Sequence, residues 1–197
     1  MIIGLTGGIA SGKSTAARML GTWGAHVIDA DKLGHQAYLR GSKAYDQVIA
    51  TFGNDVVGDD GEIDRRALGA KVFGAGNRLS ELTDIVWPAI RRLARKEIEQ
   101  AQRDRPDVVV VLEAAVLIEA GWQDLVDEVW LTVVDPAVAV ARARARDGVD
   151  AATVQARIDA QLSNAQRETH ADKVIDNSGT EAELIQQLEG LWASLQA

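Results

Sequence analysis

The feature that most restricts the fold of this chain is a glycine-rich segment near its start, GLTGGIASGKST. From Gly7 to Ser14 the segment matches the pattern G-x-x-x-x-G-K-S of a phosphate-binding P-loop. In such a loop a buried strand turns through glycines into a helix, whose first backbone N–H groups face an anion. Residues 1–5 are apolar, and residues 14–23 carry apolar side chains at helical spacing. The sequence therefore predicts a strand, a P-loop and a helix in that order.

The P-loop pattern assigns a chemical role to each part of the segment. The backbone is expected to wrap the phosphates of ATP, Lys13 to reach the outer phosphates, and the Ser14 hydroxyl to ligate Mg²⁺. The expected nucleotide-binding residues of the loop are Gly7, Gly8, Ile9, Ala10, Ser11, Gly12, Lys13, Ser14 and Thr15. The alternative is an ordinary glycine-rich turn with a solvated lysine, which the strand-to-helix context disfavours. Because the loop should be exposed, replacing Lys13 is expected to leave the stability nearly unchanged.

Four further short apolar runs predict strands of the same sheet. They lie at residues 26–28, 108–112, 129–134 and 174–175, and a carboxylate residue directly follows each of them. Runs of Val, Ile and Leu without alternation are typical of strands covered by helices on both faces, so we expect an α/β fold with a five-stranded parallel sheet. Ligands of such sheets bind beyond the carboxyl ends of the strands. The P-loop and these acids are expected to meet there.

The spacing of the strands predicts how the 197 residues are organised. About eighty residues separate the second and third strands, too many for one crossover. They are read as a helical substrate-binding insert at 31–104, with helices at 31–39, 43–52, 64–73 and 78–103. A helical pair at 136–146 and 151–164 is read as a lid covering 136–170. The nucleotide core of this single domain would then consist of residues 1–30, 105–135 and 171–197.

Composition excludes several classes of function. The chain has 29 acidic and 21 basic residues and a net charge of −8, without the positive footprint of a general nucleic-acid binder. It has no cysteine, so disulfides and thiolate metal sites are excluded. No apolar run is long enough to cross a membrane. We therefore expect a cytoplasmic protein without nucleic-acid or membrane partners, either a monomer or a small homo-oligomer.

Arginines of the expected lid are candidates for phosphate binding. Arg142 and Arg146 lie four residues apart on one helix face, whereas Arg144 points elsewhere. In a phosphoryl-transfer enzyme, a mobile helical pair carrying arginines can close over the nucleotide and neutralise charge on the transferred group. The alternative is a solvated basic face paired with nearby acids, and the two interpretations stay open here.

Carboxylates after the second and third strands are candidates for catalysis. Asp29 and Asp31 should lie near the P-loop, where one of them can accept a proton from an attacking hydroxyl. Capping of the next helix is the alternative role for either residue. Glu113 would hold the water shell of Mg²⁺ or, alternatively, pair with a neighbouring helix.

These motifs together resemble the dephospho-coenzyme A kinase family. The match runs nearly end to end through GLTGGIASGKST, VIDAD, FGNDVVGDDGEIDRRALGAKVF, LIEAGW, ARARDG, RIDAQL and ADKVIDNSG. The resemblance implies ATP-dependent phosphorylation of the 3′-hydroxyl of the ribose of dephospho-CoA, the last step of coenzyme A synthesis. It further implies that Asp31 is the base, that Lys13 and Ser14 act in the P-loop, and that Arg142 and Arg146 are lid arginines. Asn177, within the segment DNSG, is implied to lie near the adenine.

Several positions depart from the common bacterial pattern of the family. Trp87 stands for a histidine, His35 for an arginine and Ala139 for a glutamine, and EAAVL replaces an Asp-x-Pro-Leu-Leu segment. The variant segments DKLGHQAY, LTDIVWPAI and AAVLIEAGWQDLVDEVW instead resemble the kinase domain of the animal bifunctional CoA synthase. These departures indicate a subfamily form of the enzyme.

Three other functions compete with this interpretation. Another P-loop kinase of small molecules, such as a nucleoside monophosphate or shikimate kinase, is disfavoured by the long insert. A GTP-binding switch is suggested by DVVG at residues 55–58, but no N-K-x-D segment is present to recognise guanine. A catalytically inactive scaffold is disfavoured by Lys13, Ser14, Asp31 and Arg142.

Overall fold

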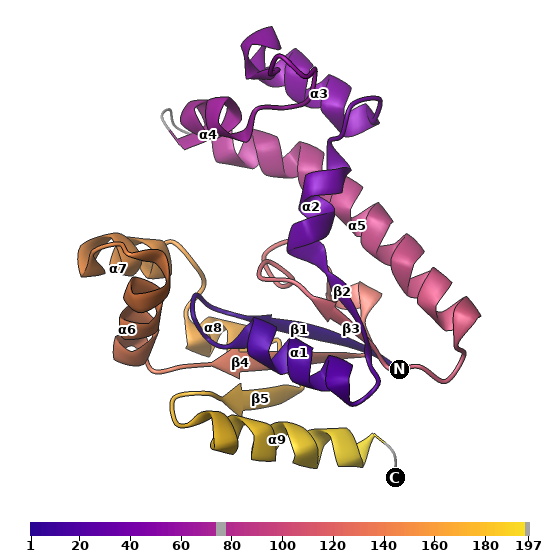
Figure 1. Cartoon of the computed structure of the whole chain (residues 1–197), viewed down its shortest axis with the longest axis vertical. Helices are drawn as coiled ribbons and strands as arrows, with labels where there is room; N and C mark the ends of the chain where they lie inside the picture. The colour runs from indigo at the N-terminus through magenta and orange to yellow at the C-terminus, as the bar shows by residue number, and fades with distance from the viewer. Residues whose placement is uncertain (74–77, 196–197) are drawn as a thin grey trace. The chain divides into compact units, whose positions relative to one another are not determined.

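The computed structural model describes residues 1–73 and 78–195 (Figure 1). The chain divides into two units: Met1–Asp29 together with Ile98–Ala197, and Ala30–Glu97. The first unit contains the sheet and the P-loop, and the second is helical.

The sheet of the first unit has five parallel strands, as predicted. Their order across the sheet is β2-β3-β1-β4-β5. The central strand β1 therefore has the P-loop at its carboxyl end, between the ends of β3 and β4. The strands are β1 (Ile2–Gly7), β2 (His26–Asp29), β3 (Val110–Glu113), β4 (Glu128–Val133) and β5 (Lys173–Asp176).

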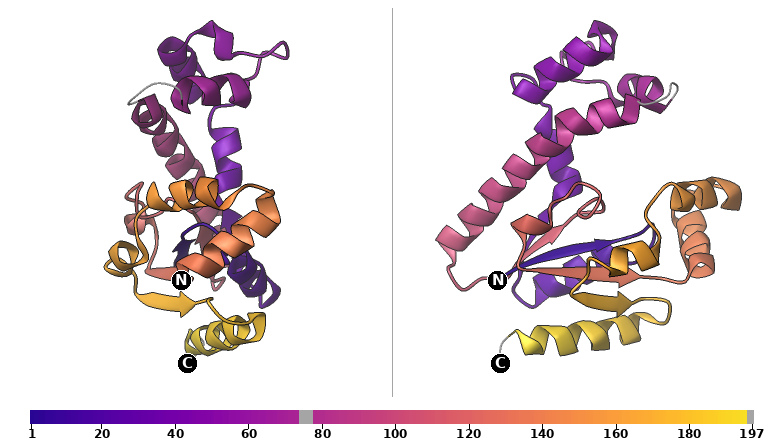
Figure 2. Two further views of the ribbon diagram at one scale, coloured as in Figure 1. Left: turned by 90° about the vertical axis from the view of Figure 1, so that its left-hand side faces the viewer. Right: turned by 180° about the vertical axis from the view of Figure 1, so that it is seen from behind.

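Helices cover both faces of this sheet (Figure 2). On one face α1 (Lys13–Thr22) and α9 (Glu181–Ser194) contribute Leu20 and Leu188 to a buried apolar core with Ile3 and Trp130 of the sheet. The short helix α8 (Asn164–Glu168) lies on the opposite face. Helix α9 was not predicted from the sequence, although Thr180 and Glu183 form a capping box at its start.

The helical pair after β4 differs from its prediction in one respect. α6 (Pro136–Asp147) begins at Pro136 as expected, with the Asp135 carboxylate accepting hydrogen bonds from its first N–H groups. The predicted helix at 151–164 is wrong: α7 (Ala151–Asp159) ends five residues earlier, and α8 follows. The reason is a capping box in which Ser163 and Gln166 bond reciprocally and start a new helix.

The second unit consists of the helices predicted for the stretch after β2. They pack around Val48, Phe52 and Leu68, which are buried. Its elements are α2 (Ala30–Ala37), α3 (Lys43–Phe52), the 3₁₀ turn η1 (Asn54–Val56), α4 (Arg65–Phe73) and the part of α5 (Arg78–Asp104) up to Glu97. The remaining short element of the chain, η2 (Gln123–Leu125), lies between β3 and β4. Within the described residues, no helix is both long and apolar enough to cross a membrane.

Candidate active site

Glycines at both ends of the P-loop are required by packing. A Cβ atom on Gly7 would lie 2.3 Å from Thr132 Oγ1 and 2.5 Å from Ser11 Oγ. Gly12 adopts a φ of 87°, in the left-handed region that favours glycine, and a Cβ there would lie 2.0 Å from Asn177 Nδ2. The loop therefore runs directly against the side chains that follow it in β4 and after β5.

Polar contacts fix the loop between its two glycines. Ser11 Oγ and Thr132 Oγ1 lie 2.7 Å apart in a buried hydrogen bond, and the Asn177 side chain donates to the Ser11 carbonyl at 2.9 Å. Because Gly12 has no side chain, none caps the first N–H groups of α1. A helix start of this kind is suited to an anion such as a phosphate.

Lys13 and Ser14 converge on the carboxylate of Glu113 at the end of β3. Lys13 Nζ lies 2.8 Å from Glu113 Oε1, and Ser14 Oγ donates to the same oxygen at 2.6 Å. The Lys13 and Glu113 side chains are only 11% and 9% exposed. The positive charge of Lys13 is therefore balanced by a largely buried carboxylate.

The oxygen atoms at this point fit a magnesium ion. Mg²⁺ prefers hard oxygen ligands and is commonly held by one or two carboxylates together with phosphates of the substrate. Ser14 Oγ and the Glu113 carboxylate supply two such oxygens side by side. Among the described residues, no three His, Cys, Asp or Glu side chains group into a metal site. A magnesium ion here would thus depend on phosphate oxygens as further ligands.

The α6 arginines do not point at a common anion. Arg142 Nη1 donates to the Asn177 carbonyl at 2.7 Å, and its Nη2 to the Gly179 carbonyl at 3.1 Å. Arg146 Nε instead donates to Asp147 Oδ1 at 2.7 Å, and this hydrogen bond lowers the pKa of the Asp147 carboxyl. Arg144 lies exposed between them. The expected lid arginines are thus each bonded to neighbouring protein groups.

The loop after β5 is anchored at the start of α6. The Asp176 carboxylate accepts hydrogen bonds from the Ser178 hydroxyl and the Ser178 N–H, and these bonds lower the pKa of the Asp176 carboxyl. Ser178 Oγ in turn accepts from the Asp135 N–H at 2.9 Å. This chain of bonds fixes the carbonyl groups that receive Arg142.

The candidate carboxylates lie in different units. Asp29 is in register with Glu113 across the β2–β3 pair, so both sit at the carboxyl edge of the sheet. Asp31 follows two residues later in the first turn of α2, where a carboxylate is favoured by the helix dipole. Because α2 belongs to the second unit, the approach of Asp31 to the P-loop stays a prediction.

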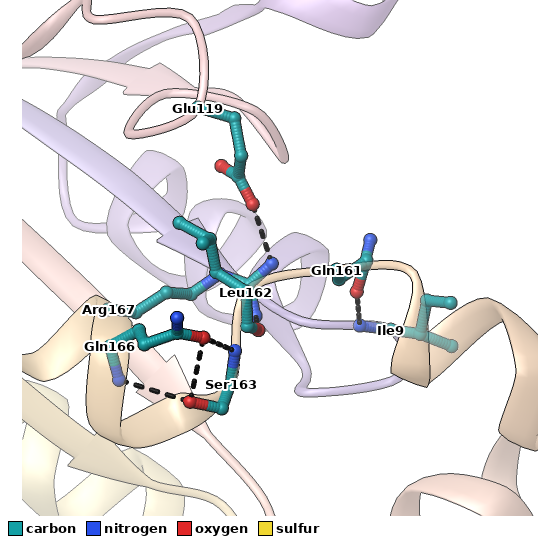
Figure 3. A network of polar contacts seen from close by, with 7 residues as sticks. All are labelled: Ile9, Glu119, Gln161, Leu162, Ser163, Gln166 and Arg167. Carbon is teal, nitrogen blue, oxygen red and sulfur yellow. Dashed lines mark hydrogen bonds and ion pairs between the residues drawn. The ribbon is translucent and has the colours of Figure 1, made fainter.

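Gln161, Arg167 and Glu119 contact the P-loop or support it, although no sequence pattern predicted a role for them (Figure 3). Gln161 Oε1 accepts a hydrogen bond from the Ile9 N–H at 3.2 Å. The Arg167 side chain is 2% exposed and forms an ion pair of 2.8 Å with Glu119, and a Cβ atom placed on Gly8 would lie 3.4 Å from Arg167 Nη1. Its Nη1 also donates to the Leu162 carbonyl. Gln161 lies inside the quoted segment RIDAQL, but nothing in the spacing of Glu119 and Arg167 indicates that they pair.

A cavity of about 550 Å³ opens beside this network. Its walls are mainly apolar, and the P-loop contributes Gly8 and Ile9 to them. The other lining residues come from the segment after β4, from α6, α7 and α8, and from the turn between α7 and α8: Val134, Pro136, Ala139, Ile158, Asp159, Gln161, Leu162, Ser163, Asn164, Ala165, Gln166 and Arg167.

A five-stranded parallel sheet with a P-loop at the end of its central strand defines a P-loop kinase fold. The dephospho-CoA kinase family model matches residues 1–183. A dephospho-CoA kinase of Geobacter sulfurreducens is 44% identical over 98% of this chain and 97% of its own length. One from Leifsonia xyli is 39% identical over 98% of both chains. The chain belongs to the dephospho-CoA kinase family, which catalyses the final step of coenzyme A synthesis.

Solved structures agree with this assignment. A protein from Thermus thermophilus superposes with a TM-score of 0.82 at 34% identity, covering 99% of this chain and 97% of that one. A dephospho-CoA kinase from Campylobacter jejuni gives 0.70 at 25% identity, covering 98% and 96%. A shikimate kinase from Bacteroides thetaiotaomicron, at 16% identity and a TM-score of 0.52, shares the fold alone.

Proposed function

We propose that the dephospho-CoA kinase activity of this chain uses ATP and Mg²⁺ and is centred on the P-loop. The observation that carries the proposal is the convergence of Lys13 Nζ and Ser14 Oγ on Glu113 Oε1, at 2.8 and 2.6 Å. A cation, a hydroxyl and a carboxylate at the start of an uncapped helix are the groups that a magnesium-bound polyphosphate requires. The backbone from Gly7 to Thr15 would wrap the phosphates.

Nucleotide binding would exchange one partner of Lys13 for another. Lys13 would turn from the Glu113 carboxylate to the outer phosphates of ATP, so that its charge stays paired throughout. The Ser14 hydroxyl and the freed carboxylate would hold Mg²⁺, which when bound neutralises charge on the phosphates. Positioning and charge neutralisation supply most of the catalysis in phosphoryl transfer, because its transition state is loose.

Asp31 is our candidate for the general base. The ribose 3′-oxygen would attack the γ-phosphorus, the bond from that phosphorus to the oxygen of ADP would break, and the hydroxyl proton would pass to the Asp31 carboxylate. Asp29 is the neighbouring alternative, because it is in register with Glu113. Dephospho-CoA would be bound by the helical residues 31–104.

Arg142, Arg146 and Asn177 would complete the nucleotide site. We propose that Asn177, which holds the Ser11 carbonyl, lies near the adenine, and that residues 136–170 act as a lid over the phosphates. For Arg142 and Arg146 to reach the transferred group, each must leave its present hydrogen bonds. A cytoplasmic location and a monomeric or small homo-oligomeric state remain predictions from the sequence.

The activity is tested by a coupled assay of ADP release. We expect ATP consumption with dephospho-CoA and none above background with adenosine, AMP or shikimate as the acceptor. Product analysis should place the new phosphate on the 3′-hydroxyl. Tight GTP binding with negligible turnover would instead indicate a nucleotide switch, and turnover with shikimate would indicate a different P-loop kinase.

The base is tested by three variants measured at saturating dephospho-CoA. Asp31→Asn keeps the size of the side chain but cannot take the proton, so kcat should fall by roughly two to four orders of magnitude with ATP affinity little altered. Asp31→Glu keeps basicity and shifts the carboxylate, which separates basicity from position. A crippled Asp29→Asn variant beside an active Asp31→Asn variant would move the assignment to Asp29.

A further inference from the structure

The P-loop is contacted at its start by a side chain far along the sequence. Gln161 Oε1 accepts the hydrogen bond of the Ile9 N–H at 3.2 Å, across 152 residues. Gln161 follows the end of α7, and its side chain points toward Ile9 (Figure 3). Together with Gly8 and Ile9, Gln161 lines the cavity beside the loop. A neutral amide oxygen therefore holds one backbone donor of a loop built to receive a polyphosphate.

The position of Gln161 is fixed from behind by Arg167. The Arg167 guanidinium donates to the carbonyl of Leu162, the next residue after Gln161, and to Glu119 Oε1 at 2.8 Å. The capping box between Ser163 and Gln166 fixes the chain at the next residue. The turn that presents Gln161 is therefore tied to the protein at two consecutive positions.

The ion pair behind this turn is poorly suited to stabilising the fold. Arg167 Nε and Glu119 Oε2 are buried, and neither has a hydrogen-bond partner among the described residues. A buried ion pair repays its desolvation only when its remaining donors and acceptors are also satisfied. An arrangement of this kind is better explained by the geometry that it imposes on residues 161–163.

We propose that Gln161 is a positioning residue of the P-loop, which holds the Ile9 N–H through a neutral acceptor beside the bound polyphosphate. The proposal rests on the proposed function only in that nucleotide phosphates occupy the P-loop. Neutrality matters because a carboxylate at the same position would accept the same hydrogen bond but repel the phosphates. Gln161 acts through the loop backbone, and Arg167 and Glu119 act through Gln161.

Titration calorimetry with ATP and with inorganic tripolyphosphate tests this role. Gln161→Ala removes the acceptor, so ATP should bind about three- to tenfold more weakly, as expected for one neutral hydrogen bond. Gln161→Glu keeps an acceptor but adds charge, so binding should weaken by about tenfold or more and recover partly at high salt. Tripolyphosphate should follow the same order, because the effect does not involve the adenosine.

A matched control is available on α9. Gln186 is exposed, so Gln186→Glu makes the same change of charge on a helix outside both the proposed lid and the helical insert. Its ATP affinity should stay within about twofold of the unchanged chain. Gln161→Glu binding ATP as tightly as the unchanged chain would overturn the proposal, as would wild-type affinity in Gln161→Ala.

Steady-state kinetics separates this role from a general loss of structure. The Gln161 variants should raise the KM for ATP and leave the KM for dephospho-CoA within about twofold, because only the P-loop is disturbed. Equal changes in both KM values would indicate a structural role and overturn the proposal. Failure of the proposed function would look different, since the unchanged chain would then release no ADP.

Discussion

The P-loop and helix α6 both carry cations that the proposed reaction requires, but the protein holds these cations in opposite ways. Lys13 is 11% exposed and is paired with Glu113, a carboxylate almost as buried. Arg146 is 64% exposed and is paired with its neighbour Asp147. The fold thus holds Lys13 in a largely buried ion pair within the P-loop, whereas Arg146 lies in solvent beside an acid of its own helix.

This difference predicts which charges can move at low cost. A largely buried cation is costly to leave without a counter-charge, so in the proposed reaction Lys13 would pass from Glu113 to phosphate in one exchange. A solvated ion pair contributes little to stability, so Arg146 can leave Asp147 readily. Under the proposed function, Lys13 would therefore need only to change partner, whereas Arg142 and Arg146 would have to leave their hydrogen bonds.

The largest effect is expected for Lys13→Ala. Turnover should fall by roughly two orders of magnitude or more, because the outer phosphates lose their charge partner in the transition state. The premise that Lys13 is exposed is wrong, since its side chain is 11% exposed and paired with Glu113, so we now expect the substitution to lower stability. Loss of Lys13 leaves the carboxylate short of a partner, which should cost about 1 to 3 kcal/mol in urea unfolding.

The double variant Lys13→Ala with Glu113→Gln is the matched control. The neutral amide needs no counter-charge, so the double variant should regain most of the lost stability while remaining inactive. If the double variant were as unstable as Lys13→Ala, the buried ion pair would not be the cause. Near-normal turnover in Lys13→Ala would show that the P-loop itself had been misread.

A smaller loss is expected for Arg142→Lys. The Arg142 guanidinium is a planar fork of donors that spans the carbonyl groups of Asn177 and Gly179 and that, in the proposed reaction, would turn to the transferred phosphoryl group. An ammonium cannot reproduce that fork on the phosphate. We expect kcat/KM for ATP to fall by about tenfold. Arg144→Lys makes the same change at an exposed position of the same helix and should be nearly silent. Equal effects of Arg142→Lys and Arg144→Lys on kcat/KM would indicate that these arginines form a solvated basic face and that Arg142 does not bind phosphate.

The two regions also differ in how far the sequence predicts them. The P-loop is a local pattern, so Gly7 to Ser14 could be assigned from spacing alone, and the strand ends placed Glu113 at the same edge. The ion pair of Lys13 with Glu113 was harder to predict from the sequence, because it joins residues a hundred positions apart. Gln161 and Arg167 were missed for the same reason: hydrophobic periodicity carries no information on which buried polar groups meet.

One error at the sequence level was avoidable. The predicted helix at 151–164 ignored the S-x-x-Q signature of Ser163 and Gln166, which marks the start of a new helix. The partners of Arg142 were not predictable in this way, since they are backbone carbonyls of a loop and no residue type signals them. Local chemistry was therefore readable from the sequence, whereas tertiary polar contacts required the fold.

A smaller effect, on the KM for ATP, is expected for Asp147→Asn. This variant removes the carboxylate that accepts the hydrogen bond of Arg146, so the arginine would be available to phosphate. The KM for ATP should therefore fall by about two- to threefold at low salt, which is the size of effect expected from a surface ion pair. High salt should abolish the difference. An unchanged KM for ATP at low salt would show that Arg146 does not bind the nucleotide when its pairing with Asp147 is removed.

The smallest effect is expected for Asp176→Asn, and it is a pH effect on stability. Hydrogen bonds from Ser178 lower the pKa of Asp176 from its ordinary value of 3.8, so the folded chain favours the ionised form. The stabilisation by these hydrogen bonds is therefore complete above the unfolded pKa of about 3.8 and is lost as pH falls through the lower folded pKa. Because Asp176 is exposed, Asp176→Asn should lower the free energy of unfolding by about half a kcal/mol or less at neutral pH.

Urea unfolding between about pH 3 and pH 7 measures the difference in free energy of unfolding between Asp176→Asn and the unchanged chain. This difference should stay constant above about pH 5 and become smaller below it. Ser178→Ala removes the hydroxyl donor but keeps the N–H. The difference in free energy of unfolding between this variant and the unchanged chain should therefore become smaller over the same pH range. Asp176 fixes the loop whose carbonyls receive Arg142, so acid should also loosen the present site of that arginine. The difference in free energy of unfolding between Asp176→Asn and the unchanged chain could instead be independent of pH. That result would show that the Asp176 carboxylate contributes through its shape alone and that the carbonyl contacts of Arg142 do not depend on the charge of Asp176.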